Sequence, residues 1–352
     1  MPPRLAGIFS RRTCGAARPI LLLSLAVIAL LAFLWSLFLS LGAHAASHEN
    51  AQDIPPWSII GKQGDGPGQF QQPRGITTLP DGSFVVVDRA ARVQHLSADG
   101  KALGGWSMKE HQKGNPKGLC WMPNGDLLVC DTHYGQVLQM SMDGQIVKVW
   151  GSAGRGPAEF IHPLSCAVDF KKQRAYIVEY GDGNDRVQKF TLEGKFVKSW
   201  GTFGGEPGNF QRPSGVCVDA ESNVYVADAV NHRIQKFDDE GKLLKIFGKM
   251  GREPGELRYP YDVACGSDGL IYVVEFNNHR VSVFDREGAF VRAFGGPGNK
   301  DCEFANPWSL TADLNGRLLV SDTGNYRIQI FDTARTAGLK LTKTIVNEVN
   351  NE

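Results

Sequence analysis

Six prolines recur at similar intervals along the sequence, and the residues directly after them differ in chemical type. Two of these residues are cations, Arg74 and Lys117, and two are aromatic, Tyr261 and Trp308. Cations beside aromatic rings suit an anionic or glycan-like ligand, or a peptide segment with a carboxylate. The prolines are Pro73, Pro116, Pro163, Pro213, Pro260 and Pro307.

Metal chemistry is a second possibility, because His111, His133 and His162 fall in loops that should share one face. Three imidazoles can hold a catalytic zinc ion with an open fourth position. Loop histidines are more often simply solvated, and no C-x-x-C pattern suggests a zinc site. We therefore predict no metal and no cofactor, and keep these three histidines as the candidates if a metal is bound.

An acid ends each of six short apolar runs. Six carboxylates aimed at one axis would repel each other and raise each other's pKa. Repetition favours a structural role instead, in which each acid pairs with a nearby Asn and Arg. His232 and His279 belong to the same motif and receive the same structural interpretation. The acids are Asp88, Asp131, Glu179, Asp228, Glu275 and Asp322.

The elements that position these residues follow from the proline spacings of 43, 47, 50, 47 and 47 residues. A Gly-rich loop precedes each proline, and four short strands follow it. In the fourth repeat we expect strands at 215–219, 224–228, 234–237 and 243–247. Four strands in a repeat of this length are typical of a propeller blade. The sequence therefore predicts an all-β, six-bladed β-propeller of four-stranded antiparallel blades.

Three further patterns locate the core and the closure of the ring. The second strand of each repeat is almost continuously apolar, as expected for a strand covered on both faces. Residues 57–61 match the outermost strand of the other repeats, so we expect them to complete the sixth blade and remove an open sheet edge. Loop residues predicted to fill the clefts between blades are Phe70, Phe160, Phe210, Leu257 and Phe304.

Two segments share the motif acid-x-x-Asn-His-Arg, at Asp228–Arg233 and Glu275–Arg280, and the segment at Asp322 nearly matches. The pattern resembles the NHL repeat family over residues 57–332. That resemblance implies a six-bladed propeller, a fold that hosts both binding modules and enzymes. Related amidating lyases hold zinc with histidines, mostly at the start of the innermost strands, and none of the corresponding residues here, which directly follow the prolines, is a histidine. Lactonase-type propellers hold calcium with several oxygen ligands, and here only Asp262 is comparable.

Five cysteines fall in predicted strands, at places where Val or Ala would otherwise stand. We expect them to be free, buried thiols that pack as small hydrophobes. They are Cys120, Cys130, Cys166, Cys217 and Cys265.

The N-terminal part predicts a membrane segment. Residues 20–41 are almost entirely apolar, and as a helix they would span roughly 33 Å, enough to cross a bilayer. Four arginines precede this run, so residues 1–19 are expected in the cytoplasm. The length favours a retained anchor over a signal peptide, and cleavage after Ala45 would instead give a secreted protein. A linker at 42–56, the propeller at 57–335 and a tail at 336–352 complete the predicted organisation.

The charge balance of the chain argues against nucleic acid as a partner. Beyond residue 45 the chain holds 34 basic against 37 acidic residues, whereas a nucleic-acid footprint needs clustered Lys and Arg.

The sequence thus favours a non-catalytic binding or scaffold propeller, membrane-anchored with its propeller outside the cytoplasm. It would recognise a protein, a peptide or a small anionic ligand at the propeller mouth, and its oligomeric state is left open. The alternative is a metal-dependent lyase or hydrolase with its site in the central channel. Candidate ligand-binding residues are Arg74, Lys117, Tyr261 and Trp308, joined by Arg89, Tyr180 and Phe276, which follow the acids on the same face.

Overall fold

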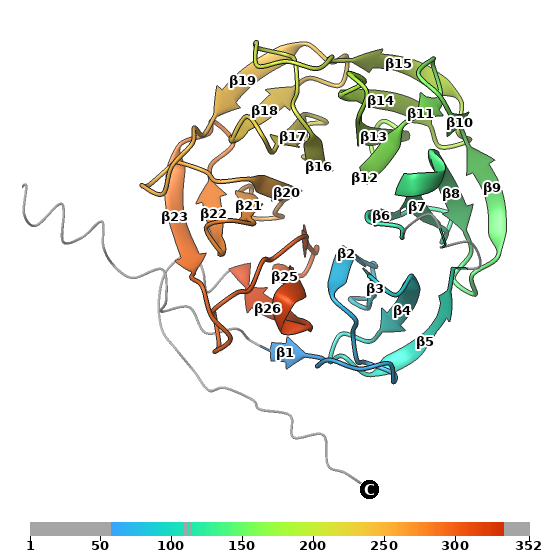
Figure 1. Ribbon diagram of the computed structural model, residues 1–352, viewed down its shortest axis with the longest axis vertical. Helices are drawn as coiled ribbons and strands as arrows, with labels where there is room; N and C mark the ends of the chain where they lie inside the picture. Colours follow the sequence, from blue (N-terminus) through green and yellow to red (C-terminus); the bar gives the residue numbers. More distant parts are fainter. Residues whose placement is uncertain (1–57, 109–111, 113–114, 334–352) are drawn as a thin grey trace, which may run out of the picture. The chain divides into compact units, whose positions relative to one another are not determined.

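The computed structural model describes residues 58–108, 112 and 115–333. They form six four-stranded antiparallel sheets, which surround a central axis as the blades of a propeller (Figure 1). Chain order runs from the axis outward in blades one to five. The predicted all-β, six-bladed propeller is therefore confirmed.

The strands of the first three blades are as follows. Blade one holds β2 (Pro73–Thr78), β3 (Phe84–Asp88), β4 (Arg92–Leu96) and β5 (Ala102–Ser107). Blade two holds β6 (Leu119–Trp121), β7 (Leu127–Asp131), β8 (Gln136–Met140) and β9 (Ile146–Trp150), with the short 3-10 helix η1 (Thr132–Tyr134). Blade three holds β12 (His162–Asp169), β13 (Arg174–Tyr180), β14 (Arg186–Thr191) and β15 (Phe196–Trp200), preceded by the parallel pair β10 (Ser152–Ala153) and β11 (Glu159–Phe160).

The remaining blades repeat this plan. Blade four holds β16 (Pro213–Val218), β17 (Val224–Asp228), β18 (Arg233–Phe237) and β19 (Leu243–Phe247). Blade five holds β20 (Pro260–Cys265), β21 (Ile271–Glu275), β22 (Arg280–Phe284) and β23 (Phe290–Gly295). Blade six holds β24 (Leu310–Ala312), β25 (Arg317–Asp322), β26 (Arg327–Asp332), the 3-10 helix η2 (Thr323–Asn325) and, as its outermost strand, β1 (Ser58–Ile60).

Blade six is closed by a strand from the other end of the propeller. Ser58 lies opposite Ile330 and Ile60 opposite Ile328 in the antiparallel pair of β1 and β26. The predicted closure is confirmed. Because one sheet joins the first and last strands of the propeller, the ring is held by backbone hydrogen bonds at its seam.

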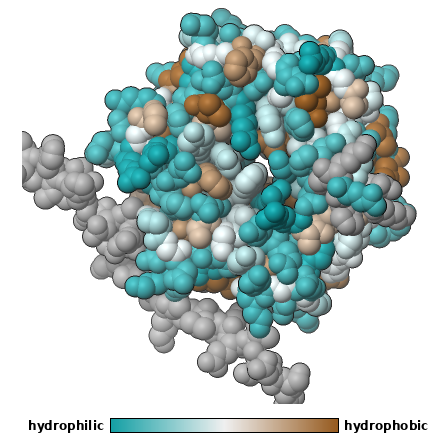
Figure 2. Space-filling model, in the orientation of Figure 1, coloured by the Kyte–Doolittle hydropathy of each residue, from teal (hydrophilic) through white to brown (hydrophobic). Residues whose placement is uncertain are grey.

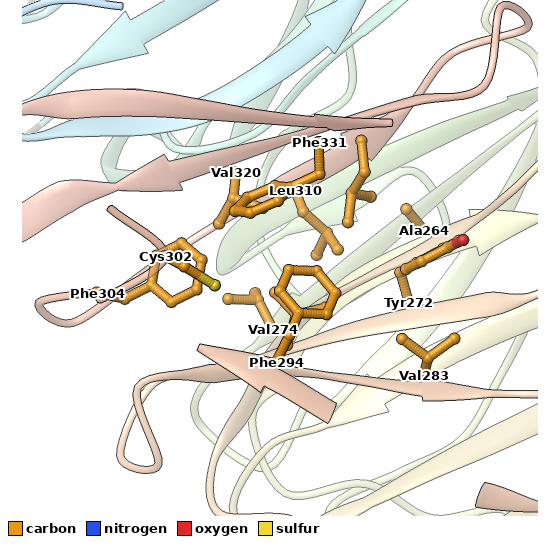
Figure 3. Packing of buried hydrophobic residues seen from close by; sticks show 12 residues of the cluster. Ala264, Tyr272, Val274, Val283, Phe294, Cys302, Phe304, Leu310, Val320 and Phe331 are labelled. Atoms are coloured by element: carbon orange, nitrogen blue, oxygen red, sulfur yellow. The ribbon is translucent and has the colours of Figure 1, made fainter. Parts of the chain in front are cut away.

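The core lies between the blades. Every residue of β3, β7, β17, β21 and β25 is buried, as predicted for second strands covered on both faces. Between blades five and six, Tyr272 and Val274 face Val320 and Phe331, with Phe304 beside them (Figure 3). The apolar contacts that stabilise the fold are thus contacts between neighbouring blades.

The Gly-rich loops carry a residue into each of these clefts. Phe210 is fully buried among residues of blades three and four, and a parallel bridge joins it to Phe203. Gly201, at φ +87°, leaves room for the ring, since a Cβ there would lie 2.3 Å from a Phe210 ring carbon. Between blades one and two, Met108 packs in the same kind of cleft. The predicted cleft-filling residues are all fully buried: Phe70, Phe160, Phe210, Leu257 and Phe304.

Each repeated acid organises its own blade. Asp228 accepts hydrogen bonds from Arg233 Nε at 2.8 Å, Asn231 Nδ2 at 2.9 Å and Gln235 Nε2 at 3.1 Å. It also accepts one from the backbone N–H of Gln211 at 2.7 Å. The Arg233 guanidinium then donates to carbonyl groups of the Gly-rich loop. The predicted pairing with both Asn and Arg is confirmed for Asp228, Glu275 and Asp322. Asp88 and Glu179 pair with Arg but not with Asn, and Asp131 has Gln136 in place of the arginine.

The motif histidines link each blade to the next. His232 Nδ1 accepts a hydrogen bond from the backbone N–H of Tyr259 at 3.0 Å, and His279 Nδ1 accepts one from Asn306 at 3.1 Å. In blade three an acid replaces the histidine, since Asp185 Oδ1 accepts from the N–H of Arg212 at 2.6 Å. Each of these donors is the residue before the proline of the next blade, so the motif also sets the position of the mouth.

The cysteine prediction was wrong for two residues. Cys217 in β16 and Cys265 in β20 form a disulfide between blades four and five, with their Cα atoms 6.0 Å apart. Neighbouring innermost strands approach closely around the axis, within the Cα separation that a disulfide needs. Cys120, Cys130 and Cys166 are free and buried, as expected.

Several predictions fall outside the described residues. They concern the apolar segment 20–41, the linker at 42–56, Trp57, His111 and the tail at 336–352. Within the described ranges, no helix has both the length and the apolar character needed to cross a bilayer.

We predict that Asp228→Ala lowers the free energy of unfolding by about 3–5 kcal/mol, because it leaves the largely buried Arg233 without its carboxylate. Urea unfolding measures the loss. Arg155→Ala is the matched control, since it removes an ion pair with Asp182 whose two side chains are 65% and 62% exposed. The control should lose less than about 1 kcal/mol. Equal losses in the two variants would contradict the structural role of Asp228.

Candidate functional site

The mouth is the end of the central channel where the innermost strands begin, and the residues after the prolines lie around it. Arg74 and Trp308 belong to neighbouring blades one and six, and the Arg74 guanidinium carbon lies 5.0 Å from the centre of the Trp308 ring. Lys117 Nζ, from blade two, lies 5.9 Å from the same ring. Trp308 therefore contacts cations from two other blades.

Aromatic rings continue the mouth on the side of blade five. Tyr261 and Phe276 stack with ring centres 4.5 Å apart, and Trp308 meets Tyr261 edge-on at 4.9 Å. These three side chains are all half-buried. They present a continuous aromatic surface beside the cations of blades one and two.

Arg212 adds a third cation, and the sequence interpretation missed it. Its guanidinium carbon lies 5.2 Å from the Tyr180 ring centre and 5.8 Å from that of Tyr261. Arg212 precedes a proline, whereas Arg74, Lys117, Tyr261 and Trp308 each follow one. A usable signal existed, because the residues before the prolines also vary between blades. They are Gln72, Asn115, His162, Arg212, Tyr259 and Asn306.

The three cations influence one another. Burial lowers the pKa of Lys117 to about 8, and the positive charges of Arg74 and Arg212 contribute to the shift. Burial and the charge of Arg89 likewise lower the pKa of Arg74. No salt bridge within the described part of the chain involves Arg74, Lys117 or Arg212. The mouth is therefore a site of concentrated, uncompensated positive charge.

Asp88 does not neutralise Arg74. Its carboxylate is occupied by Arg92, with Nη2 at 2.6 Å and Nε at 3.1 Å. Arg89, another candidate, is exposed and donates from Nη1 to Gln72 Oε1 at 3.0 Å. The structure thus places Arg89 at the edge of the site and Arg74 within it.

Two of the candidate histidines, His133 and His162, lie together beside the Tyr180 ring. His133 and His162 have ring centres 6.0 Å apart, and His162 stacks on Tyr180 at 5.1 Å. Burial lowers the pKa of His133, with further contributions from Lys117, His162 and Arg74. The described residues contain no group of three His, Cys, Asp or Glu side chains able to hold a metal ion.

A cavity of about 200 Å³ lies in the central channel and is lined by the innermost strands. Asp262 is its charged lining residue, and burial raises the pKa of this carboxyl to about 7. Asp262 Oδ2 accepts hydrogen bonds from Ser309 Oγ at 2.5 Å and from the N–H of Leu310 at 3.2 Å. With this carboxylate already engaged by neighbouring donors, it is a poor ligand for a hard cation.

The chemistry open to this arrangement is recognition of an anion next to apolar or planar groups. Guanidinium and ammonium groups form strong charge-assisted hydrogen bonds with carboxylate or phosphate oxygens, and the rings supply flat contact area. On the face drawn in Figure 2, hydrophobic residues are scattered singly among hydrophilic ones.

Comparison with known proteins identifies the repeat. The NHL repeat profile matches residues 210–237, 257–284 and 304–331, which are the three repeats whose motifs were recognised best. Each match runs from the cleft-filling loop residue to the end of the third strand. A search of curated proteins found no match.

Solved structures share the fold. Virginiamycin B lyase from Staphylococcus aureus has a TM-score of 0.53 at 13% identity, over 80% of this chain and 96% of the lyase. A protein of unknown function from Bacteroides thetaiotaomicron has a TM-score of 0.60 at 16% identity, over 78% and 76% of the two chains. A gluconolactonase from Xanthomonas campestris has a TM-score of 0.57 at 13% identity, over 75% and 86%. At these identities the likeness concerns the fold alone.

We predict that Lys117 titrates near pH 8 and that Arg74→Gln raises this pKa, because the variant removes one of the neighbouring positive charges. The ¹³Cε resonances of labelled lysine report the titration directly. Arg155→Gln is the control, since that arginine is exposed and pairs with Asp182. A Lys117 titration near the ordinary lysine value of about 10.4 would contradict the described environment.

Proposed function

This chain is a six-bladed β-propeller that carries NHL repeats, and from that premise we propose that it is a non-catalytic binding protein. Its mouth would recognise an anionic group, with the carboxylate of a peptide or protein segment as the favoured ligand. The observation that carries the proposal is the convergence of Arg74, Lys117 and Arg212 without an ion-pair partner among the described residues.

The electrostatics of the mouth support this function. Lys117 is buried, and this burial, followed by the nearby positive charges of Arg74 and Arg212, disfavours its charged form and lowers its pKa. The buried Nε atoms of Arg74 and Arg212 have no hydrogen-bond partner. A bound anion would offset the repulsion and satisfy several donors at once. Such an arrangement is unfavourable for folding alone and favourable for a binding site.

The aromatic half of the mouth narrows the ligand class. Stacked Tyr261 and Phe276 with Trp308 edge-on present rings to whatever lies beside the anion. A small inorganic anion would leave these rings unused. A peptide segment has both a carboxylate and planar or apolar groups, so it fits the two halves together.

The cellular setting is part of the same proposal. The apolar segment 20–41 and the arginines before it suggest a propeller held outside the cytoplasm. The Cys217–Cys265 disulfide supports such a compartment, because disulfides persist where the surroundings are oxidising. In that setting the mouth would face partners on the outer side of the membrane.

A metal-dependent lyase or hydrolase is the competing function, and the names of two structural neighbours give it its support. Both neighbours are at 13% identity, where the fold carries over and the reaction does not. In this chain the mouth and the channel hold His133, His162 and the engaged carboxylate of Asp262, and the described residues contain no group of three such side chains able to hold a metal ion. Cationic and aromatic residues occupy the rest of the mouth.

We predict that tetrapeptides ending in an aromatic residue bind at least about 10-fold more tightly as free acids than as C-terminal amides. A charge-assisted hydrogen bond contributes about 1.5–3 kcal/mol, which corresponds to this ratio or more. Isothermal titration calorimetry at pH 7 gives both affinities. Between pH 7 and pH 9 the preference for the acid should fall, because Lys117 loses its charge near pH 8.

The double variant Arg74→Gln, Lys117→Gln should reduce the affinity for the acid to that for the amide, and Arg155→Gln should leave it unchanged. Mass spectrometry of the recovered peptides, with and without a metal chelator, separates binding from catalysis. Equal affinities for acid and amide would contradict the proposed ligand class. Cleaved peptide that disappears on chelation would favour the lyase or hydrolase.

A further inference from the structure

Three cysteine side chains meet between blades two and three. Cys120 lies in β6, Cys130 in β7 and Cys166 in β12. The Cys166 thiol donates to the carbonyl oxygen of Leu128 at an Sγ–O distance of 3.6 Å. Leu128 lies directly opposite Cys120 in the sheet, and Cys130 is two residues further along the same strand. Cys166 is therefore placed between the two cysteines of blade two.

All three cysteines belong to one buried cluster between blades two and three. Their exposure differs. Cys120 is 8% and Cys166 6% exposed, whereas Cys130 is fully buried. Only the first two line the cavity of about 200 Å³ in the central channel.

The same cavity is lined by the disulfide of blades four and five. Cys217 and Cys265 lie on the neighbouring innermost strands β16 and β20, in the same way that Cys120 and Cys166 lie on β6 and β12. The channel wall therefore carries one disulfide-bonded pair and one pair of free cysteines. Each pair spans two adjacent blades.

We propose that Cys120 and Cys166 are a redox-active dithiol that a small disulfide entering the channel converts into a second inter-blade disulfide. Cys130 is a buried neighbour that stays reduced. The proposal is independent of what the mouth binds, because it concerns the channel wall alone.

The reaction balances as two thiol–disulfide exchanges. The Cys120 sulfur, as thiolate, attacks one sulfur of the small disulfide, and the other half leaves as a thiol. The Cys166 thiolate then attacks Cys120 Sγ and releases the second half. Two protein thiols are oxidised, one small disulfide is reduced, and the protons of the protein thiols end on the two released thiols.

The structure also indicates which thiol reacts first and which exchange step limits the rate. Burial raises the pKa of Cys166 well above its ordinary value, and the hydrogen bond with Cys166, together with burial, does the same for Cys130. A thiol held in the protonated form is a slow nucleophile. We therefore expect attack to begin at Cys120 and ring closure by Cys166 to limit the rate.

The test uses the full chain in the folded state, treated with bis(2-hydroxyethyl) disulfide and quenched with acid. Alkylation after denaturation, digestion without reduction and mass spectrometry then identify linked peptides. We expect a Cys120–Cys166 linked peptide and the loss of two alkylatable thiols per chain. Both should appear alongside the existing Cys217–Cys265 link and be reversed by dithiothreitol.

Cysteine variants show which two thiols form the new disulfide. Cys130→Ser should leave the new link unchanged, whereas Cys120→Ser should abolish it and leave a mixed disulfide or a free thiol at Cys166. The wild-type result decides the matter even if a variant fails to fold. Recovery of Cys120 and Cys166 in alkylated form would overturn the proposal, and so would a Cys130–Cys166 link.

Discussion

A buried acid paired with an arginine is the interaction on which the rest of this propeller depends. In blade four, Asp228 ties the end of the second strand to Arg233, and Arg233 holds the Gly-rich loop through three carbonyl groups. That loop delivers Phe210 into the cleft between blades. Burial raises the pKa of Asp228, so the carboxylate depends on its donors to remain charged. The buried acid and its hydrogen-bond donors therefore set both the internal geometry of a blade and its apolar contact with the neighbouring blade.

The repeated acid and histidine motifs set the position of the mouth. The side chains that take no part in these motifs give the mouth its chemistry. His232, His279 and Asp185 fix the backbone just before the prolines of the following blades. The side chains around those points are then free to vary. In this chain they are cationic on blades one, two and four and aromatic on blades five and six. A rigid, repeated frame thus presents a non-repeating surface, which is the condition for selective recognition.

Much of the fold could be predicted because its determinants are local. The run ending in Asp228 and the cleft-filling Phe210 are each read within one repeat, and the proline spacing gives the length of that repeat. Contacts between repeats were harder to foresee. Cys217 and Cys265 stand at different offsets from their prolines, and their pairing depends on how two innermost strands approach each other at the axis.

The candidate site likewise depends on contacts between blades that a sequence pattern within one repeat does not show. Arg74, Lys117, Tyr261 and Trp308 could be grouped from the sequence as variable positions, but the reach of Trp308 to Lys117 depends on side-chain length and direction across an intervening blade. Arg212 was missed because its side chain enters the mouth from the residue before a proline.

The most direct test of an anion-binding mouth is a crystal of this chain soaked in sodium iodide, with the iodide located by its anomalous scattering. We predict a strong iodide peak among Arg74, Lys117 and Arg212, and its loss in Arg74→Gln, Lys117→Gln crystals. Iodide bound elsewhere on the surface, with none at the mouth, would contradict it.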